Sequence, residues 1–153
     1  MAKVAILGVG KMGAAMAKEL AAAKHEVILW NRTTDKAKAL ADTLENSTVA
    51  NNLSDALKIA DVAICMFVSG LVTEEALLSN PNILQNAKKS IVIVDMGTSG
   101  VDSAKRLESG ISKAGLKFVD APVSGSIATI AAHQLLVMAS GNQSDIEAVE
   151  PVL

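Results

Sequence analysis

A glycine pattern close to the N-terminus limits the possible folds of this chain more than any other feature. The pattern G-x-G-x-x-G spans residues 8–13 and directly follows the apolar run 4–7, and Met12, Met16 and Leu20 then recur at helical spacing. A strand, a tight turn and a helix in this order form the setting in which such glycines bind the diphosphate of a dinucleotide. The sequence therefore predicts a phosphate-binding turn, made by Gly8, Gly10, Lys11, Met12 and Gly13.

Apolar runs and helical stretches alternate along the rest of the chain. Strands are expected at 4–7, 26–30, near 48–50, and at 61–67, 91–95, 117–120 and 135–139, and helices at 12–20, 34–44, 54–59, 72–78, 103–114 and from about 144, with a turn at 80–82. The alternation predicts an α/β fold, a doubly wound and mostly parallel sheet of the Rossmann type. A flavodoxin-like sheet is the alternative that the glycine pattern disfavours. We expect residues 1–153 to form one dinucleotide-binding domain.

Composition narrows the classes of partner and compartment. The formal net charge is −2 and the 14 lysines and arginines are scattered, which argues against nucleic acid as a partner. The apolar runs are shorter than the roughly 20 residues of a membrane-spanning helix, so no membrane association is expected. The single cysteine, Cys65, cannot form an internal disulfide, and we see no secretory leader, so a soluble, cytoplasmic protein is expected. Half of the residues are hydrophobic, which suggests that some apolar surface meets another domain or subunit.

The end of the second expected strand indicates which dinucleotide is bound. A site for NAD(H) has a carboxylate here that accepts from the adenosine 2′-hydroxyl, whereas this chain has no acidic residue between Glu26 and Asp35. Basic and hydrogen-bonding side chains that suit a 2′-phosphate stand there instead. We therefore expect NADP(H) rather than NAD(H), with the phosphate contacted by Asn31, Arg32, Thr33 and Lys36.

Three segments together resemble the β-hydroxyacid dehydrogenase family, which includes 3-hydroxyisobutyrate dehydrogenase and NADPH-dependent semialdehyde and glyoxylate reductases. Residues 8–13 are similar to its G-x-G-x-M-G opening, residues 31–33 to the N-R-T of its NADP-using branch, and residues 120–125 to its D-A-P-V-S-G-G motif. The resemblance implies an oxidoreductase that transfers a hydride between the nicotinamide cofactor and a small β-hydroxyacid or its semialdehyde or oxo-acid.

The resemblance also implies positions for the substrate. Ser124 and Gly125 match residues that hold the substrate carboxylate, and Thr98 matches a threonine near substrate and nicotinamide. Val68 is placed among the cofactor contacts, and no metal is expected. Thr98 and Ser124 both follow expected strands, where open α/β sheets bind ligands, although both could instead be loop hydroxyls that cap the local backbone.

This chain departs from the family pattern after Gly125. Ser126, Thr129 and His133 stand where the family usually has glycines, and Ala131 stands where an acid is common. These changes predict a narrowed or redirected carboxylate pocket. His133 could donate to a substrate, but a surface role is the favoured interpretation, and His25 is expected to be structural or solvent-facing.

The resemblance places the proton-donating lysine beyond Leu153, in a helical second domain that also closes the site and makes the dimer. We therefore assign no catalytic residue within 1–153 and expect the chain alone to be inactive, with homo-oligomers requiring the further domain. Two alternatives stay open. One is a non-catalytic NADP(H)-binding module, and the other is the cofactor domain of an imine reductase, which has a similar G-x-G-x-M-G and N-R-T but lacks an intact D-A-P-V-S-G.

Overall fold

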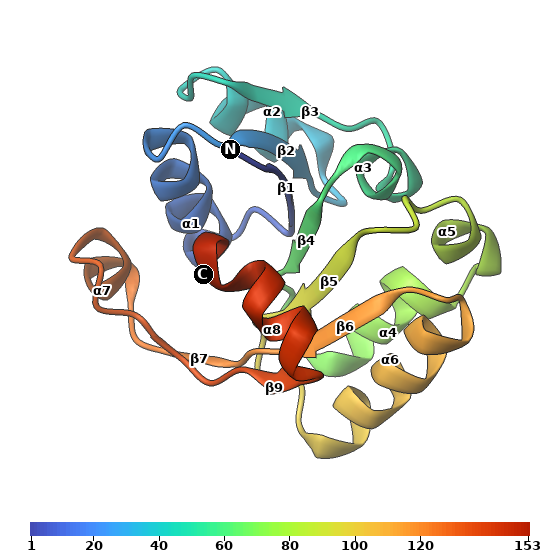
Figure 1. The fold of residues 1–153 in the computed structure, drawn as a ribbon. Coiled ribbons are helices and arrows are strands. Elements are labelled where there is room, and N and C mark those ends of the chain that lie inside the picture. Colours follow the sequence, from blue (N-terminus) through green and yellow to red (C-terminus); the bar gives the residue numbers. More distant parts are fainter.

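The computed structural model describes all residues from Met1 to Leu153. A seven-stranded sheet forms its centre (Figure 1), with the strand order β3-β2-β1-β4-β5-β6-β9. Strands β7 and β8 pair separately as a two-stranded ribbon. The strands are β1 (Lys3–Leu7), β2 (Glu26–Trp30), β3 (Ser47–Val49), β4 (Val62–Cys65), β5 (Val92–Asp95), β6 (Lys117–Asp120), β7 (Val123–Ser124), β8 (Leu136–Val137) and β9 (Ser140–Gly141).

Helices connect the strands. They are α1 (Lys11–Ala22), α2 (Thr34–Ala41), α3 (Leu53–Ile59), α4 (Gly70–Leu78), α5 (Pro81–Gln85), α6 (Val101–Lys113), α7 (Ile127–Ala131) and α8 (Gln143–Val149), followed by a 3-10 turn, Glu150–Val152. None of the helices is long and apolar enough to cross a membrane.

Strands β1 to β6 are all parallel, and the order of their connections reverses beside β1. From β1 the chain passes outward to β2 and β3, then returns to β4 on the other side and continues to β5 and β6. This is the order of the Rossmann fold, in which a dinucleotide lies across the carboxyl ends of the strands at the point of reversal. The predicted doubly wound sheet is confirmed.

Alternating side chains of each buried strand pack on the two faces of the sheet. Val4 and Ile6 belong to a core beneath α1, α2 and α8, whereas Ala5 and Leu7 belong to a core beneath α3, α4, α5 and α6. The same alternation runs through β4 and β5, which explains why these strands are apolar up to Asp95 at the end of β5. Both faces of the sheet are therefore covered by helices, and the carboxyl ends of the strands remain as the edge for ligands.

The expected strand 135–139 was wrong in detail. Residues 136–137 pair antiparallel with β7, outside the main sheet, and residues 140–141 form an antiparallel edge beside β6. Residues 123–137, which comprise β7, α7 and β8, form an arm beside the main sheet. Helix α7 lies at the far end of this arm and was not predicted (Figure 1). The expected turn at 80–82 is instead the start of α5, where the Asn80 side chain accepts the N–H of Asn82.

Candidate cofactor-binding site

The first glycine turn has the shape of a phosphate cradle. Gly8 has φ +102°, and a side chain there would lie 2.7 Å from the carbonyl oxygen of Met66. A Cβ added to Gly10 would meet no atom within 4 Å, so this glycine faces open space at the start of α1. Gly13 packs against the carbonyl of Gly8, which a side chain would strike. The helix therefore begins against the turn, with free backbone N–H groups directed at the open space.

The tip of β2 is tied to this turn by Asn31. Its Oδ1 accepts the N–H of Val9 at 3.1 Å, and its Nδ2 donates to the carbonyl of Thr33 at 3.1 Å. These two contacts hold the exposed Arg32 beside the glycine turn. The expected contact of Asn31 with a phosphate stays a prediction.

A cleft of about 520 Å³ opens between the ends of β1, β2 and β4 on one side and helices α4 and α5 on the other. Apolar side chains form much of its lining, and Trp30 and Phe67 meet edge to face with their ring centroids 6.2 Å apart. The charged residues of the lining are two cations near β2 and one acid on α4. The lining residues are Gly8, Val9, Gly10, Trp30, Asn31, Arg32, Thr33, Lys36, Leu53, Met66, Phe67, Val68, Val72, Glu75, Ala76, Ser79 and Ile83.

Most of the predicted cofactor residues meet in this cleft. Lys11, Met12 and Gly13 lie in α1 outside the lining, and Thr98 is in the loop after β5, also outside it. Sequence reasoning missed the wall that α4 contributes. The spacing of Val72, Glu75, Ala76 and Ser79, at i, i+3, i+4 and i+7, was the available signal that one helical face looks into the site.

The predicted substrate residues lie further along the same edge. Thr98 is exposed in the loop after β5, and Ser124 is exposed at the end of β7, which pairs with β8 outside the main sheet. At the tip of the arm the Ser126 N–H donates to Thr129 Oγ1 at 2.7 Å, and the same hydroxyl donates to the Ser126 carbonyl at 2.8 Å. The departure from the family pattern therefore has a structural effect, because Thr129 occupies a backbone donor beside Gly125.

Two acids end the strands that lead to these loops. Asp95 and Asp120 are register partners at the ends of β5 and β6. Burial raises the pKa of both carboxyl groups, and for Asp95 the hydrogen bonds from Ser99 and Gly97 oppose that rise. Neither acid was singled out from the sequence, because a strand that ends in Asp gives no sign of how deeply the side chain is buried.

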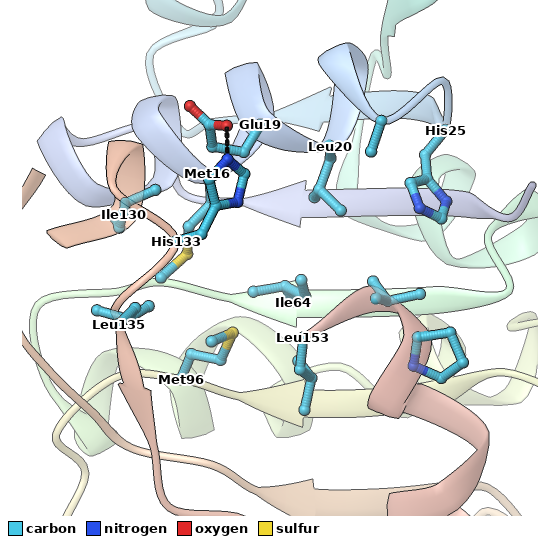
Figure 2. Close-up of a pocket in the computed structure, with 13 residues that line it drawn as sticks. Met16, Glu19, Leu20, His25, Ile64, Met96, Ile130, His133, Leu135 and Leu153 are labelled. Atoms are coloured by element: carbon cyan, nitrogen blue, oxygen red, sulfur yellow. Dashed lines mark ion pairs between the residues drawn. The ribbon is translucent and has the colours of Figure 1, made fainter.

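A second cavity, of about 260 Å³, lies on the opposite face of the sheet between α1 and the C-terminal turn (Figure 2). Its lining is mainly apolar, including Met16, Leu20 and Ile64, and none of the glycine-turn residues reaches it. The exposed His133 lies at the rim of this cavity, in a turn with φ +54°, and its Nε2 is 3.6 Å from Glu19 Oε2. His25 has the expected structural contact, because its Nδ1 accepts the N–H of Ala2.

Comparison with known proteins agrees with this geometry. Residues 3–153 match the family described as the NAD binding domain of 6-phosphogluconate dehydrogenase. The chain belongs to this family. As a member it is a domain that binds a nicotinamide dinucleotide, and the Rossmann-type sheet, the glycine turn and the cleft are the parts of the structure that fit such a ligand.

Several relatives of this NAD-binding domain are oxidoreductases by name. Mitochondrial 3-hydroxyisobutyrate dehydrogenase of Rattus norvegicus is 30% identical over 150 residues, covering 98% of this chain and 44% of that protein. Among solved structures, Mycobacterium tuberculosis 3-hydroxyisobutyrate dehydrogenase with L-serine has a TM-score of 0.91 at 30% identity, covering 100% of this chain and 51% of that one. An imine reductase from Pseudomonas sp. has a TM-score of 0.90 at 27% identity, covering 99% and 51%. The chain thus spans about half the length of the relatives that it matches.

Proposed function

We propose that this domain binds NADP(H) in preference to NAD(H). The observation that carries the proposal is the tip of β2, where Arg32 and Lys36 line the cleft and no acid follows the strand. A carboxylate at that tip would accept from a 2′-hydroxyl and repel a 2′-phosphate, whereas a guanidinium pairs with the phosphate. The one acid of the lining, Glu75, belongs to α4 on the opposite wall.

Calorimetric titration of the chain with NADPH and with NADH tests this preference. Each charge-assisted hydrogen bond to the additional phosphate contributes about 1.5–3 kcal/mol, so NADPH should bind at least about tenfold more tightly. Equal or tighter binding of NADH would end the proposal, while leaving the dinucleotide-binding fold in place.

The proposed reaction is that of an oxidoreductase acting on a small β-hydroxyacid or its semialdehyde or oxo-acid. When bound, the cofactor supplies the hydride chemistry. In this proposal the glycine turn holds the diphosphate and Arg32 fixes the adenosine end. Thr98, in the loop after β5, and Ser124 and Gly125, at the end of β7, would contact the substrate. The names of the 3-hydroxyisobutyrate dehydrogenase relatives support this substrate class.

The Ser126 to Thr129 hydrogen bond favours a second candidate, an imine reductase-like reaction. An N–H that already donates at 2.7 Å to Thr129 Oγ1 is not free for a substrate carboxylate, and an uncharged imine needs no such donor. Loading the chain with NADPH and titrating it with 3-hydroxyisobutyrate and with a cyclic imine would separate the two. Binding of the acid alone supports the first reaction, and binding of the imine alone supports the second.

We infer that the complete enzyme has a further domain that supplies the proton donor and the dimer contact. The resemblance implies a helical domain with a donor lysine, and the relatives are about twice as long as this chain. A non-catalytic NADP(H)-binding module remains the alternative for the chain alone.

A further inference from the structure

Asp95 is a buried acid that no basic residue neutralises. Its side chain is fully buried at the end of β5, and none of the ion pairs in the chain includes it. Oδ2 accepts the hydroxyl of Ser99 at 2.5 Å and Oδ1 accepts the N–H of Gly97 at 3.2 Å. Two donated hydrogen bonds to the two oxygens are the arrangement of an ionised carboxylate. These two hydrogen bonds favour a negative charge at the carboxyl edge of the sheet, against the burial that raises the pKa of Asp95.

The hydrogen bonds of Asp95 fix the loop after β5, and this loop lies close to the loop after β4. A side chain on Gly97 would lie 3.2 Å from the Phe67 carbonyl and 3.3 Å from Asp95 Oδ1, and one on Gly70 would lie 2.7 Å from the Ser99 carbonyl. Phe67 is also part of the cleft lining. Asp95 thus lies close to the loop that carries Phe67 in the wall of the cofactor cleft.

The strand order indicates which half of the cofactor lies next to this wall of the cleft. The diphosphate cradle is at the end of β1, and Arg32 places the adenosine half over the end of β2. The nicotinamide half then extends over β4, β5 and β6, on the side where Asp95 and its register partner Asp120 end their strands. This step rests on the proposed dinucleotide function of the cleft.

We propose that Asp95 is a positioning residue with an electrostatic effect: it fixes the loop after β5 and biases the bound cofactor towards its oxidised form. The oxidised nicotinamide ring carries a positive charge and the reduced ring is neutral. A fixed negative charge in the protein interior attracts the former and has little effect on the latter, because charge interactions in a medium of low dielectric constant persist over several ångströms. A residue that only fixed the loop would change the affinity for both forms equally.

Two substitutions separate the charge from the loop contact. Asp95→Asn keeps an oxygen acceptor and the size of the side chain but removes the charge, whereas Ser99→Ala removes the hydroxyl and keeps the charge. Calorimetric titration with NADP⁺ and NADPH should show that Asp95→Asn raises the Kd ratio of NADP⁺ to NADPH by about threefold or more. That is the order expected for a unit charge roughly 10 Å away at an effective dielectric constant between those of protein and water. Ser99→Ala should leave the ratio unchanged.

Asp102→Asn is the matched control, because Asp102 is an exposed acid in the first turn of α6. Its ratio should stay within twofold of that of the unmodified chain. An unchanged ratio in folded Asp95→Asn, or an equal change in Asp102→Asn, would overturn the proposal. If Asp95→Asn does not fold, Asp120→Asn should raise the Kd ratio of NADP⁺ to NADPH instead. An unchanged ratio in Asp120→Asn would then overturn the proposal. Failure of the unmodified chain to bind either form would instead contradict the proposed function.

Discussion

Arg32 is the residue on which the choice of cofactor depends. Its guanidinium is exposed at the rim of the cleft, and Asn31 holds the adjoining backbone to the glycine turn. Replacing Arg32 with Ala should weaken NADPH binding about tenfold or more and leave NADH binding nearly unchanged, because only NADPH carries the 2′-phosphate. Titration of both cofactors measures this, with Lys38→Ala as control, since Lys38 is an exposed cation of α2 outside the cleft. Unchanged NADPH affinity in Arg32→Ala would show that the phosphate is held elsewhere.

Asp61 links stability to pH at a site remote from the cleft. Its carboxylate accepts the N–H of Lys3 at 2.8 Å and pairs with Lys88 Nζ at 2.5 Å, and these contacts lower the pKa of Asp61. A lowered folded-state pKa stabilises the chain above the unfolded pKa near 4, and this contribution is lost as the pH falls through the folded value. Asp61→Asn should therefore cost about 0.5–1 kcal/mol at pH 7 and almost nothing at pH 2–3.

Urea denaturation at both pH values measures the difference, with Glu45→Gln as control. The ion pair of Glu45 with Lys24 is exposed and 3.6 Å long, so its loss should not be measurable at either pH. A cost for Asp61→Asn that stays the same at pH 3 would mean that the contacts do not depend on the charge of Asp61.

Single residues also show what could and could not be predicted from the sequence. The motif N-R-T was sufficient to place Arg32 in the site, but it did not reveal that the Asn31 amide is used for Val9 and Thr33, since hydrogen-bond partners depend on the spatial approach of two loops. Glu75 was missed because it was not considered together with Val72, Ala76 and Ser79, whose helical spacing places them on the same wall of the cleft.

At the scale of elements, the two glycines Gly10 and Gly13 at the start of α1 have different roles. Gly10 serves cofactor binding, and Gly13 serves the packing of the helix against the turn. Gly10 has φ −68° and open space around it, so Gly10→Val should abolish cofactor binding at a cost of about 1 kcal/mol or less in stability. Gly13→Ala should destabilise the chain by about 1–3 kcal/mol, because its methyl group would strike the Gly8 carbonyl. Circular dichroism melting and a NADPH titration give the two readouts. Retained binding by folded Gly10→Val would place the phosphates away from the turn.

The end of α1 offers a stabilising change. The N–H of Lys24 donates to Ala21 O and that of His25 to Leu20 O, which is a Schellman ending with Lys24 at φ +66° where glycine is preferred. Lys24→Gly should therefore raise the unfolding free energy by about 0.5–1 kcal/mol. Lys18→Gly, in the interior of the same helix, should lower it by about 1 kcal/mol. Urea denaturation measures the free energy of unfolding of both variants. A lower value for Lys24→Gly than for the unmodified chain would show that Lys24 is not strained at this position.

Sequence patterns identified the central elements and failed on the arm. Strands β4 and β5 are apolar on both faces, so their runs stood out. Residues 136–137 and 140–141 each form only two-residue strands, one in the ribbon and one at the sheet edge. A pattern with a period of two cannot assign such short strands to a sheet, because their pairing depends on where the loop after β6 turns back.

At the scale of the whole molecule, we predict that the chain binds the cofactor but does not turn it over. We expect the 153-residue chain to bind NADPH but not to oxidise it above background with glyoxylate, succinic semialdehyde or tartronate semialdehyde. The proposed donor lysine and closing domain are not among residues 1–153, and general acid catalysis alone contributes about 10²–10⁴ in rate. Absorbance at 340 nm follows the reaction, with a full-length dehydrogenase as positive control. Robust turnover would contradict the assignment of the proton donor and would direct attention to His133.

The placement of the cofactor is the central claim, and amide chemical-shift mapping by NMR tests it most directly. On addition of NADPH, the largest shifts should occur at residues 8–10, 31–33 and 67–76, around the larger cleft. NADH should reproduce the shifts at the glycine turn but not those at Arg32, since it lacks the 2′-phosphate. Residues of the cavity on the opposite face, such as Leu20, His25 and Ile130, should remain unshifted. Shifts centred on that cavity, with none at the glycine turn, would contradict the account.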